Sequence, residues 1–397
     1  MNIGPSKENA SWNSVMQSVS EDEIAEIADA LLAFSVGILI KAFENDRSGV
    51  SGRRRPEREF NAMVETMDGE NYEISLFDGI IASIHGALKA VLNSDDECVN
   101  ETFETLASTL LGDKSKADVV VRCALYNALI FVLLHEYAHI VCGHFRFEIA
   151  KQNPNSDRPT QHRFREVSDS SIRFELTSLM GTEVVNRFAA LSELEADATA
   201  YQLLSDFAYE IFVANSEVAE TIPAKLPPHE VPAPVLQATN ELQFYSATLA
   251  LSLIEFARKR QGDSGGYPLP FTRVMNIATV MIGKLAPGPW TSEGSRQRLS
   301  KQSTPWVQEF AVRTIYNAME LCEVSCRGLG LDLREIIDFA RFDETVEKTL
   351  TLDLFAILQD KADDLATREA QELMRLQNCG EEFRTLLRPF RMKKWWD

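Results

Sequence analysis

The stretch Leu133–His144, "LLHEYAHIVCGH", places three histidines and a glutamate in a strongly apolar helical segment. On an α-helix, His135 and His139 lie one turn apart and project from the same face, about 6 Å apart along the axis. Two imidazoles placed in this way can share one metal ion. Glu136 follows the first histidine, where it cannot easily bind the metal but can reach a water molecule bound to it. The pattern is H-E-x-x-H, in which zinc lowers the pKa of water toward about 7 and the glutamate takes the proton.

A catalytic zinc site needs three protein ligands and an open position, so a third ligand is expected elsewhere in the chain. The stretch "LSELEADATAYQLL" supplies one, because Glu193 and Asp197 are four residues apart on a predicted helix and share one face. We expect Glu193 to bind the metal. We expect Asp197 to accept a hydrogen bond from the non-ligating nitrogen of a histidine, with His139 as the favoured donor.

Three neighbouring side chains are interpreted differently. Glu195 lies two residues from both Glu193 and Asp197, which puts it on the far side of that helix, either solvated or paired. His144 comes five residues after His139, about 140° around a continuous helix, so we expect it in a second-shell or helix-capping role. Cys142 is interpreted as a buried structural thiol.

Amide hydrolysis also needs a donor for the oxyanion, commonly from a separate loop. The stretch "GYPLPFTRVMNI" offers Tyr267 and Arg273 after a flexible glycine pair. An ordinary turn before a helix explains the same stretch equally well. Tyr267 is the candidate catalytic residue.

Composition restricts the class of protein. The chain has 397 residues, 45% of them hydrophobic, which is enough for a sizeable core, and its formal net charge of -19 disfavours nucleic acid and anionic lipid as partners. The two most apolar stretches, Leu31–Ile40 and Ala124–Leu134, are too short to span a membrane. Six cysteines without disulfide spacing, and a start without a secretory signal pattern, favour a cytoplasmic protein.

Local patterns predict a helical chain with one small sheet. Ser20 and Glu23 form a capping box, with Val19 placed to contact Ile24, and predict a helix to about residue 43. The basic stretch "NDRSGVSGRRRPER" is interpreted as a solvated linker. "FNAMVETM" and "NYEISLF", joined by Asp-Gly, predict a β-hairpin. Further helices are predicted over residues 78–93, 100–111, 117–144, 182–207, 332–342 and 343–376, with helices from 304 onward and a polar loop over 151–171.

These patterns predict an α+β, predominantly helical fold with three parts. Residues 1–57 form an N-terminal helix and basic linker, 58–290 the metallopeptidase domain with a small sheet over the zinc helix, and 291–397 a helical C-terminal region. The C-terminal region is assigned a regulatory or substrate-recognising role.

The combination of H-E-x-x-H with a downstream E-x-x-x-D resembles the gluzincin metallopeptidases. The wording "HEYAHIVCGH" with "ELEADATA" resembles the HtpX-like peptidases and, more closely, the soluble Lit-like phage-exclusion peptidases, and "YPLPFTR" is similar to a Tyr-Pro motif with a downstream arginine in these domains. The resemblance covers residues 58–285. It implies a minimal gluzincin domain with zinc on His135, His139 and Glu193, Glu136 as general base and Asp197 in the second shell.

The expected function is a soluble zinc-dependent endopeptidase that hydrolyses a specific protein or peptide substrate. Lit-like proteins cut a host protein during phage infection, so the resemblance implies a role in bacterial anti-phage defence and an activating protein partner. The alternative is a non-enzymatic interaction or regulatory protein that retains a zinc site and binds a partner through its C-terminal helices. An intact Glu136 disfavours that alternative, because a structural site needs no base. We also expect the C-terminal helices or the loop Asn153–Ser170 to cover the cleft until a partner binds.

Overall fold

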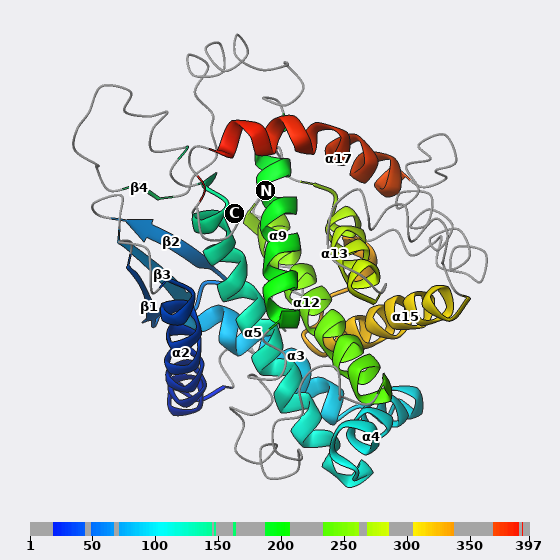
Figure 1. The fold of residues 1–397 in the computed structure, drawn as a ribbon. Coiled ribbons are helices and arrows are strands. Elements are labelled where there is room, and N and C mark those ends of the chain that lie inside the picture. Colours follow the sequence, from blue (N-terminus) through cyan, green and yellow to red (C-terminus); the bar gives the residue numbers. More distant parts are fainter. Residues whose placement is uncertain are drawn as a thin grey trace, which may run out of the picture.

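The structure is a computed structural model, and it describes residues 19–43, 49–66, 71–144, 147, 162–163, 187–206, 233–261, 268–285, 305–336, 368–388 and 391. Its helices and strands are α2 (Glu21–Phe43), β1 (Val50–Arg55), β2 (Ala62–Thr66), β3 (Tyr72–Phe77), α3 (Asp78–Leu92), α4 (Glu97–Leu111), η1 (Lys114–Lys116), α5 (Ala117–Val141), β4 (His162–Arg163), α9 (Phe188–Asp206), α12 (Ala233–Gln261), α13 (Pro270–Leu285), α15 (Pro305–Gly328), η3 (Leu333–Glu335) and α17 (Arg368–Leu387). The predicted α+β, predominantly helical fold is confirmed (Figure 1).

Helix α2 begins where its capping residues predict. The side-chain oxygen of Ser20 accepts a hydrogen bond from the backbone N–H of Glu23 at 3.2 Å, which satisfies one of the donors left free at a helix start. Val19 and Ile24 are both buried. The helix packs against β1, α3 and α5, so this N-terminal segment lies against the sheet.

The sheet is mixed, with strand order β1-β3-β2-β4. Strands β2 and β3 pair antiparallel, from Ala62 opposite Leu76 to Thr66 opposite Tyr72, which confirms the predicted hairpin strands. The Asp-Gly turn between them lies outside the described residues. The two-residue strand β4 pairs antiparallel with β2, inside a stretch predicted as loop.

The basic segment predicted as a solvated linker is wrong in its described part, because residues 50–55 form β1 and pair in parallel with β3. Arg54 donates two hydrogen bonds to the carboxylate of Asp78, at 2.7 and 2.8 Å. Arg55 donates to Ser75 at 2.9 Å and also pairs with Glu65. These arginines have partners more than nine residues away along the chain, so their local charge density gave no sign of the strand.

Helix α5 is the central helix of the core. It packs against α3, α4, α9, α12 and the strands β2 and β3 (Figure 1). Nearly all of its side chains are buried. It ends at Val141, three residues earlier than predicted. Gly143 has a φ of 82°, a left-handed conformation that glycine adopts readily and that turns the chain away from the helix axis. His144 is therefore not on the helical surface of α5.

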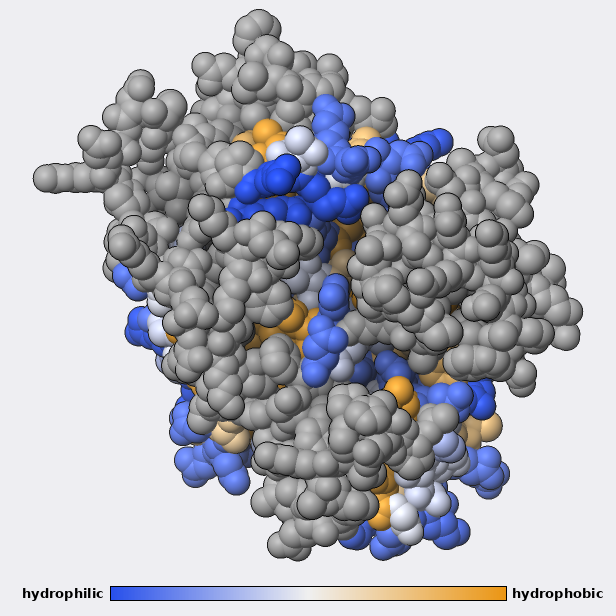
Figure 2. Space-filling view, viewed as in Figure 1, coloured by the Kyte–Doolittle hydropathy of each residue, from blue (hydrophilic) through white to orange (hydrophobic). Residues whose placement is uncertain are grey.

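The helical stretch Lys114–Val141 is long and apolar enough to cross a membrane, by length and composition only, with a mean hydropathy of 1.9 in its most apolar window. Within the protein, 78% of that window is buried. A core helix of a soluble protein passes the same test, and α5 has the contacts of a core helix. On the face drawn in Figure 2, the described surface is mainly hydrophilic and its hydrophobic patches are small and separate.

The remaining described helices extend the same core. Residues from α9, α12, α13, α15 and α17 belong to one hydrophobic cluster with those of α3 and α5. Helix α4 begins at Glu97 rather than at residue 100, because the side chain of Asp96 caps it by accepting from Cys98 N–H at 3.1 Å. In the described part of the predicted helix 332–342, only the short helix η3 forms. Three predicted features lie outside the described residues: residues 182–186, the loop Asn153–Ser170 apart from β4, and Tyr267.

Candidate metal centre

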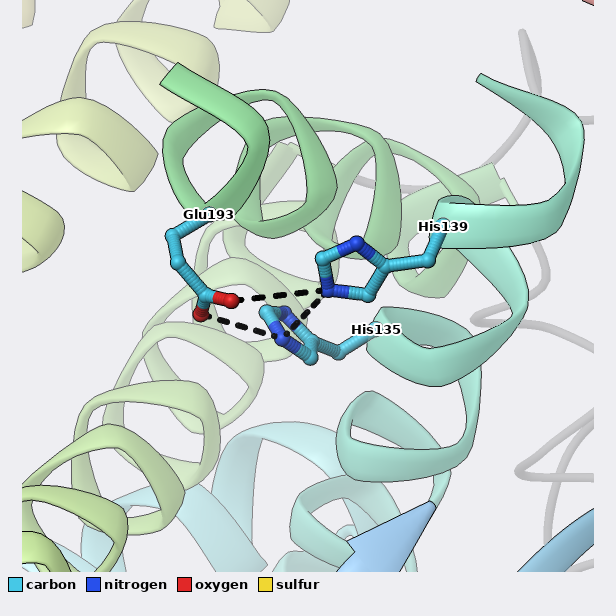
Figure 3. Close-up of side chains that lie close together, drawn as sticks. All are labelled: His135, His139 and Glu193. Atoms are coloured by element: carbon cyan, nitrogen blue, oxygen red, sulfur yellow. Dashed lines mark hydrogen bonds and ion pairs between the residues drawn. The ribbon is translucent and has the colours of Figure 1, made fainter. Parts of the chain in front are cut away.

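The three predicted metal ligands meet between α5 and α9. His135 and His139 project from α5 toward Glu193 on α9 (Figure 3). The two Nε2 atoms are 3.3 Å apart, and the Glu193 carboxylate oxygens lie 3.4 Å from His135 Nε2 and 3.7 Å from His139 Nε2. All three side chains are buried. The group can therefore hold a single metal ion.

The ionisation of two of these groups suits metal binding. Burial and the neighbouring charge of His135 lower the pKa of His139, so its imidazole is neutral and its nitrogen lone pair is available. Burial opposes ionisation of Glu193, but the contact with His135 and the charge of Arg273 hold the pKa of its carboxyl well below its ordinary value. A neutral imidazole and a carboxylate are the forms that bind divalent cations.

His135 carries a different charge in the metal-free site. Burial lowers its pKa, but contacts with Asp197 and Glu193 outweigh burial and raise the pKa of His135 to about 10. At neutral pH its proton therefore lies among carboxylates, where a cation is favoured. A metal ion that binds here has to displace this proton.

A carboxylate and an arginine stand behind His135. Its Nδ1 lies 3.0 Å from Oδ1 of Asp197, at hydrogen-bonding distance although the two groups are not fully aligned. Arg273 on α13 donates two hydrogen bonds to Asp197, both at 2.7 Å. We call Asp197 and Arg273 the His135 network. The prediction that Asp197 serves His139 is wrong, because its position on α9 brings it to His135 instead.

Arg273 is engaged by three carboxylates. It is fully buried, and besides Asp197 its nitrogens contact Glu193 at 3.2 Å and Glu255 on α12 at 3.3 Å. These carboxylates raise its pKa despite burial, so it stays charged. Arg273 therefore positions the acidic groups around His135, and its complete burial disfavours a role as oxyanion donor.

A second chain of contacts stands behind His139. Its Nδ1 lies 2.9 Å from Nδ1 of His144, whose Nε2 lies 3.0 Å from Oε2 of Glu195. Arg391, at the C-terminal end of the described chain, donates to Oε1 of the same carboxylate. We call His144, Glu195 and Arg391 the His139 network. His144 therefore contacts a candidate metal ligand from behind, which agrees with its predicted position next to the ligands, and Glu195 is paired rather than solvated.

His144, Glu195 and Cys142 also lie close enough together to hold a metal ion. Burial raises the pKa of the Cys142 thiol, so it stays protonated, and its sulfur lies 3.5 Å from the hydroxyl of Thr199. The guanidinium of Arg391 already neutralises Glu195. A neutral thiol beside an arginine disfavours a second cation, and the predicted role of Cys142 as a buried thiol fits its surroundings.

Glu136 lies between the two ligands in sequence and is half-buried. Burial raises the pKa of its carboxyl to about 7, and the charge of His135 opposes that rise. A cation bound by the neighbouring histidines would also oppose the rise in the pKa of Glu136. The group is therefore able to change its protonation state close to neutral pH, which general acid–base catalysis requires.

Sequence reasoning missed two members of the site, Glu255 and Arg391. Glu255 lies on a helix whose pattern shows only an ordinary polar face. Arg391 belongs to the tail "RPFRMKKWWD", and a basic aromatic tail on a strongly acidic chain was the available signal. A comparison with family models, curated proteins and solved structures finds no match to this chain. The gluzincin resemblance stays a prediction based on its motifs.

Proposed function

We propose that this protein is a soluble zinc-dependent endopeptidase of the gluzincin type that cuts a specific protein substrate. One observation carries the proposal: the buried group formed by His135 Nε2, His139 Nε2 and the Glu193 carboxylate, next to a half-buried Glu136. The H-E-x-x-H and E-x-x-x-D motifs supply the same residues in sequence.

Zinc fits this group of ligands better than calcium or magnesium does. Zinc bonds to nitrogen and carboxylate oxygen are about 2.0–2.2 Å long, so tetrahedral ligand atoms lie about 3.3–3.6 Å apart. In the structure the two Nε2 atoms are 3.3 Å apart, and different oxygens of the Glu193 carboxylate lie 3.4 Å from His135 Nε2 and 3.7 Å from His139 Nε2, close to that range. Two imidazoles and one carboxylate are a common catalytic zinc set, whereas calcium and magnesium prefer oxygen ligands alone.

In the proposed reaction, Glu136 acts as general base and then as general acid. Bound zinc would supply Lewis-acid polarisation of the substrate carbonyl and a water that ionises near neutral pH. Glu136 takes the proton from the attacking water and delivers it to the leaving amine nitrogen. His135 and His139 are held in place by their networks, so their ring orientation is set before substrate arrives. Tyr267 remains the candidate donor for the oxyanion.

The proposed setting is the bacterial cytoplasm, in anti-phage defence, with a protein partner that activates cleavage. The motif resemblance to Lit-like peptidases supports the setting. None of the six cysteines is in a disulfide, which suits a reducing compartment, and the net charge of -19 favours protein over nucleic-acid partners.

The test compares cells that produce the wild-type protein with cells that produce Glu136→Gln, by proteomic mapping of new protein N-termini. Gln has nearly the same shape as Glu but cannot accept the proton, so we expect zinc content to be retained and cleavage to be lost. The wild type should generate a small set of new N-termini that the variant lacks. Identical N-termini in both, with or without phage infection, would reject the peptidase and favour the non-enzymatic alternative.

A further inference from the structure

We infer that Arg391, close to the C-terminal end of the chain, is a positioning residue for the metal ligand His139, so that the C-terminal segment completes the metal centre. The inference rests on the metal centre of the proposed function and not on peptide hydrolysis. Its basis is the unbroken series of contacts from Arg391 through Glu195 and His144 to His139.

The donors and acceptors in this series allow one consistent arrangement of protons. With a metal on Nε2 of His139, its Nδ1 carries the proton and donates to Nδ1 of His144. His144 then carries its own proton on Nε2 and donates it to Oε2 of Glu195. The other oxygen of Glu195 accepts from Arg391. Each ring nitrogen of the two imidazoles and each oxygen of Glu195 thus has a single role, and the series ends in a neutralised ion pair.

Arg391 fixes the orientation of the carboxylate. The Glu195 side chain is 12% exposed and the Arg391 side chain 7%, so water competes little for either group. Without the guanidinium, the carboxylate would be free to rotate away from His144 or to recruit water. His144 would then lose the bond that keeps its Nδ1 turned toward His139, and the ring of His139 would lose its fixed orientation.

Helix α17 brings Arg391 to this position. The ring of Phe383 lies 5.2 Å from that of Phe188 at the start of α9, and 5.8 Å from the imidazole of His144. Glu372, earlier in α17, accepts from the backbone N–H of Leu269 and from the hydroxyl of Thr272 at the start of α13, at 3.1 and 2.8 Å. The helix is thus attached to α9, which carries the candidate ligand Glu193, and to α13, which carries Arg273.

This arrangement couples the metal to the C-terminal segment in both directions. Zinc on His139 withdraws electron density and makes its Nδ1–H a stronger donor, which strengthens the bonds that follow. Coupling between two binding equilibria is reciprocal. Zinc must therefore stabilise docking of the C-terminal segment by the same factor by which the contact of Arg391 strengthens zinc binding.

The first test measures zinc affinity by competition with a chelating dye, in a Glu136→Gln background that prevents self-cleavage. We expect Arg391→Gln to bind zinc about tenfold more weakly, since outer-shell changes cost 10–100-fold. Arg391→Lys should recover part of the loss, and Arg388→Gln, an exposed arginine of the same segment, should bind as its parent does. Unchanged affinity in Arg391→Gln, or an equal loss in Arg388→Gln, would overturn the inference.

The second test needs no change in the C-terminal segment. Trypsin is used to follow cleavage after Arg391 in the Glu136→Gln protein, with saturating zinc and after chelation. We expect zinc to slow this cleavage about tenfold, because of the reciprocal coupling. Equal rates would contradict it. Failure of the N-terminal mapping leaves both of these results untouched, so loss of the proposed function and loss of this inference are separable.

Discussion

The two candidate ligand histidines contact networks of the same kind that come from very different places in the chain. His135 is backed directly by Asp197, and Asp197 is held by a fully buried arginine on α13. His139 is backed by a second imidazole before the carboxylate of Glu195 is reached, and the arginine there comes from the C-terminal end. Both networks end in a carboxylate neutralised by arginine. One is part of the interior, and the other depends on a terminal segment.

The largest difference between the networks is expected in stability. Arg273→Met would leave Asp197, Glu193 and Glu255 buried around His135 without their shared cation, and breaking a buried ion pair from one side costs about 3–5 kcal/mol. Arg391→Gln removes one charged hydrogen bond near the end of the chain and should cost about 1–3 kcal/mol. Urea unfolding of the metal-free proteins measures both. Equal losses in the free energy of unfolding would contradict the claim that Arg273 contributes more to stability than Arg391.

The second-largest difference between the two networks is expected in how strongly each one affects zinc affinity. Asp197→Asn touches the ligand His135 directly, and we expect about a 100-fold loss of affinity; Glu195→Gln acts through His144, and we expect about tenfold, within the range for outer-shell changes. Dye competition at one pH gives both constants. A greater loss for Glu195→Gln would show that His139, not His135, is the ligand whose orientation limits binding.

The protonation of the two histidines should also differ in the metal-free protein. Contacts with Asp197 and Glu193 raise the pKa of His135 to about 10 against the effect of burial, whereas burial and the charge of His135 lower the pKa of His139. His135 is therefore protonated below pH 10, and zinc has to displace that proton. We expect zinc affinity to rise about tenfold per pH unit between pH 8 and 10.

Nitrogen-15 NMR of the imidazoles checks this prediction directly. His135 should titrate near pH 10, and His139 should stay neutral throughout the range in which the protein is folded. Titration of His135 at an ordinary histidine pKa would remove the charge difference between the two networks.

The smallest effect is expected from Cys142, which lies beside the His139 network. Its thiol is kept protonated by burial and contacts Thr199. Cys142→Ala should therefore leave one bound zinc per chain and an affinity within about threefold of wild type, well below the 10–100-fold of outer-shell changes. Elemental analysis measures the stoichiometry. Two metal ions in the wild type and one in the variant would assign a second site to Cys142, His144 and Glu195.

The grouping of the candidate metal ligands could be predicted from the sequence because it follows from helical periodicity. Spacing of four residues fixes His135 with His139, and Glu193 with Asp197, on their helical faces whatever the rest of the fold does. The same reasoning could not say which histidine Asp197 meets. That contact depends on how α9 is rotated and shifted against α5, which is a property of packing.

Local sequence patterns could not predict contacts between distant parts of the chain. Arg391 and Glu195 are 196 residues apart, and no local rule relates them. His144 was placed by assuming that α5 continues, but the left-handed Gly143 ends it and changes where the imidazole lies. Strand β1 was missed because its arginines are neutralised by Asp78 and Glu65, which local charge cannot reveal.

The central claim is that His135, His139 and Glu193 bind one zinc ion, and anomalous X-ray diffraction at the zinc absorption edge tests it most directly. Crystals of the protein purified without chelator should show one anomalous peak, about 2.0–2.2 Å from the two Nε2 atoms and a Glu193 oxygen. A zinc-supplemented crystal with no peak at this position, or with its peak between Cys142, His144 and Glu195, would contradict the account.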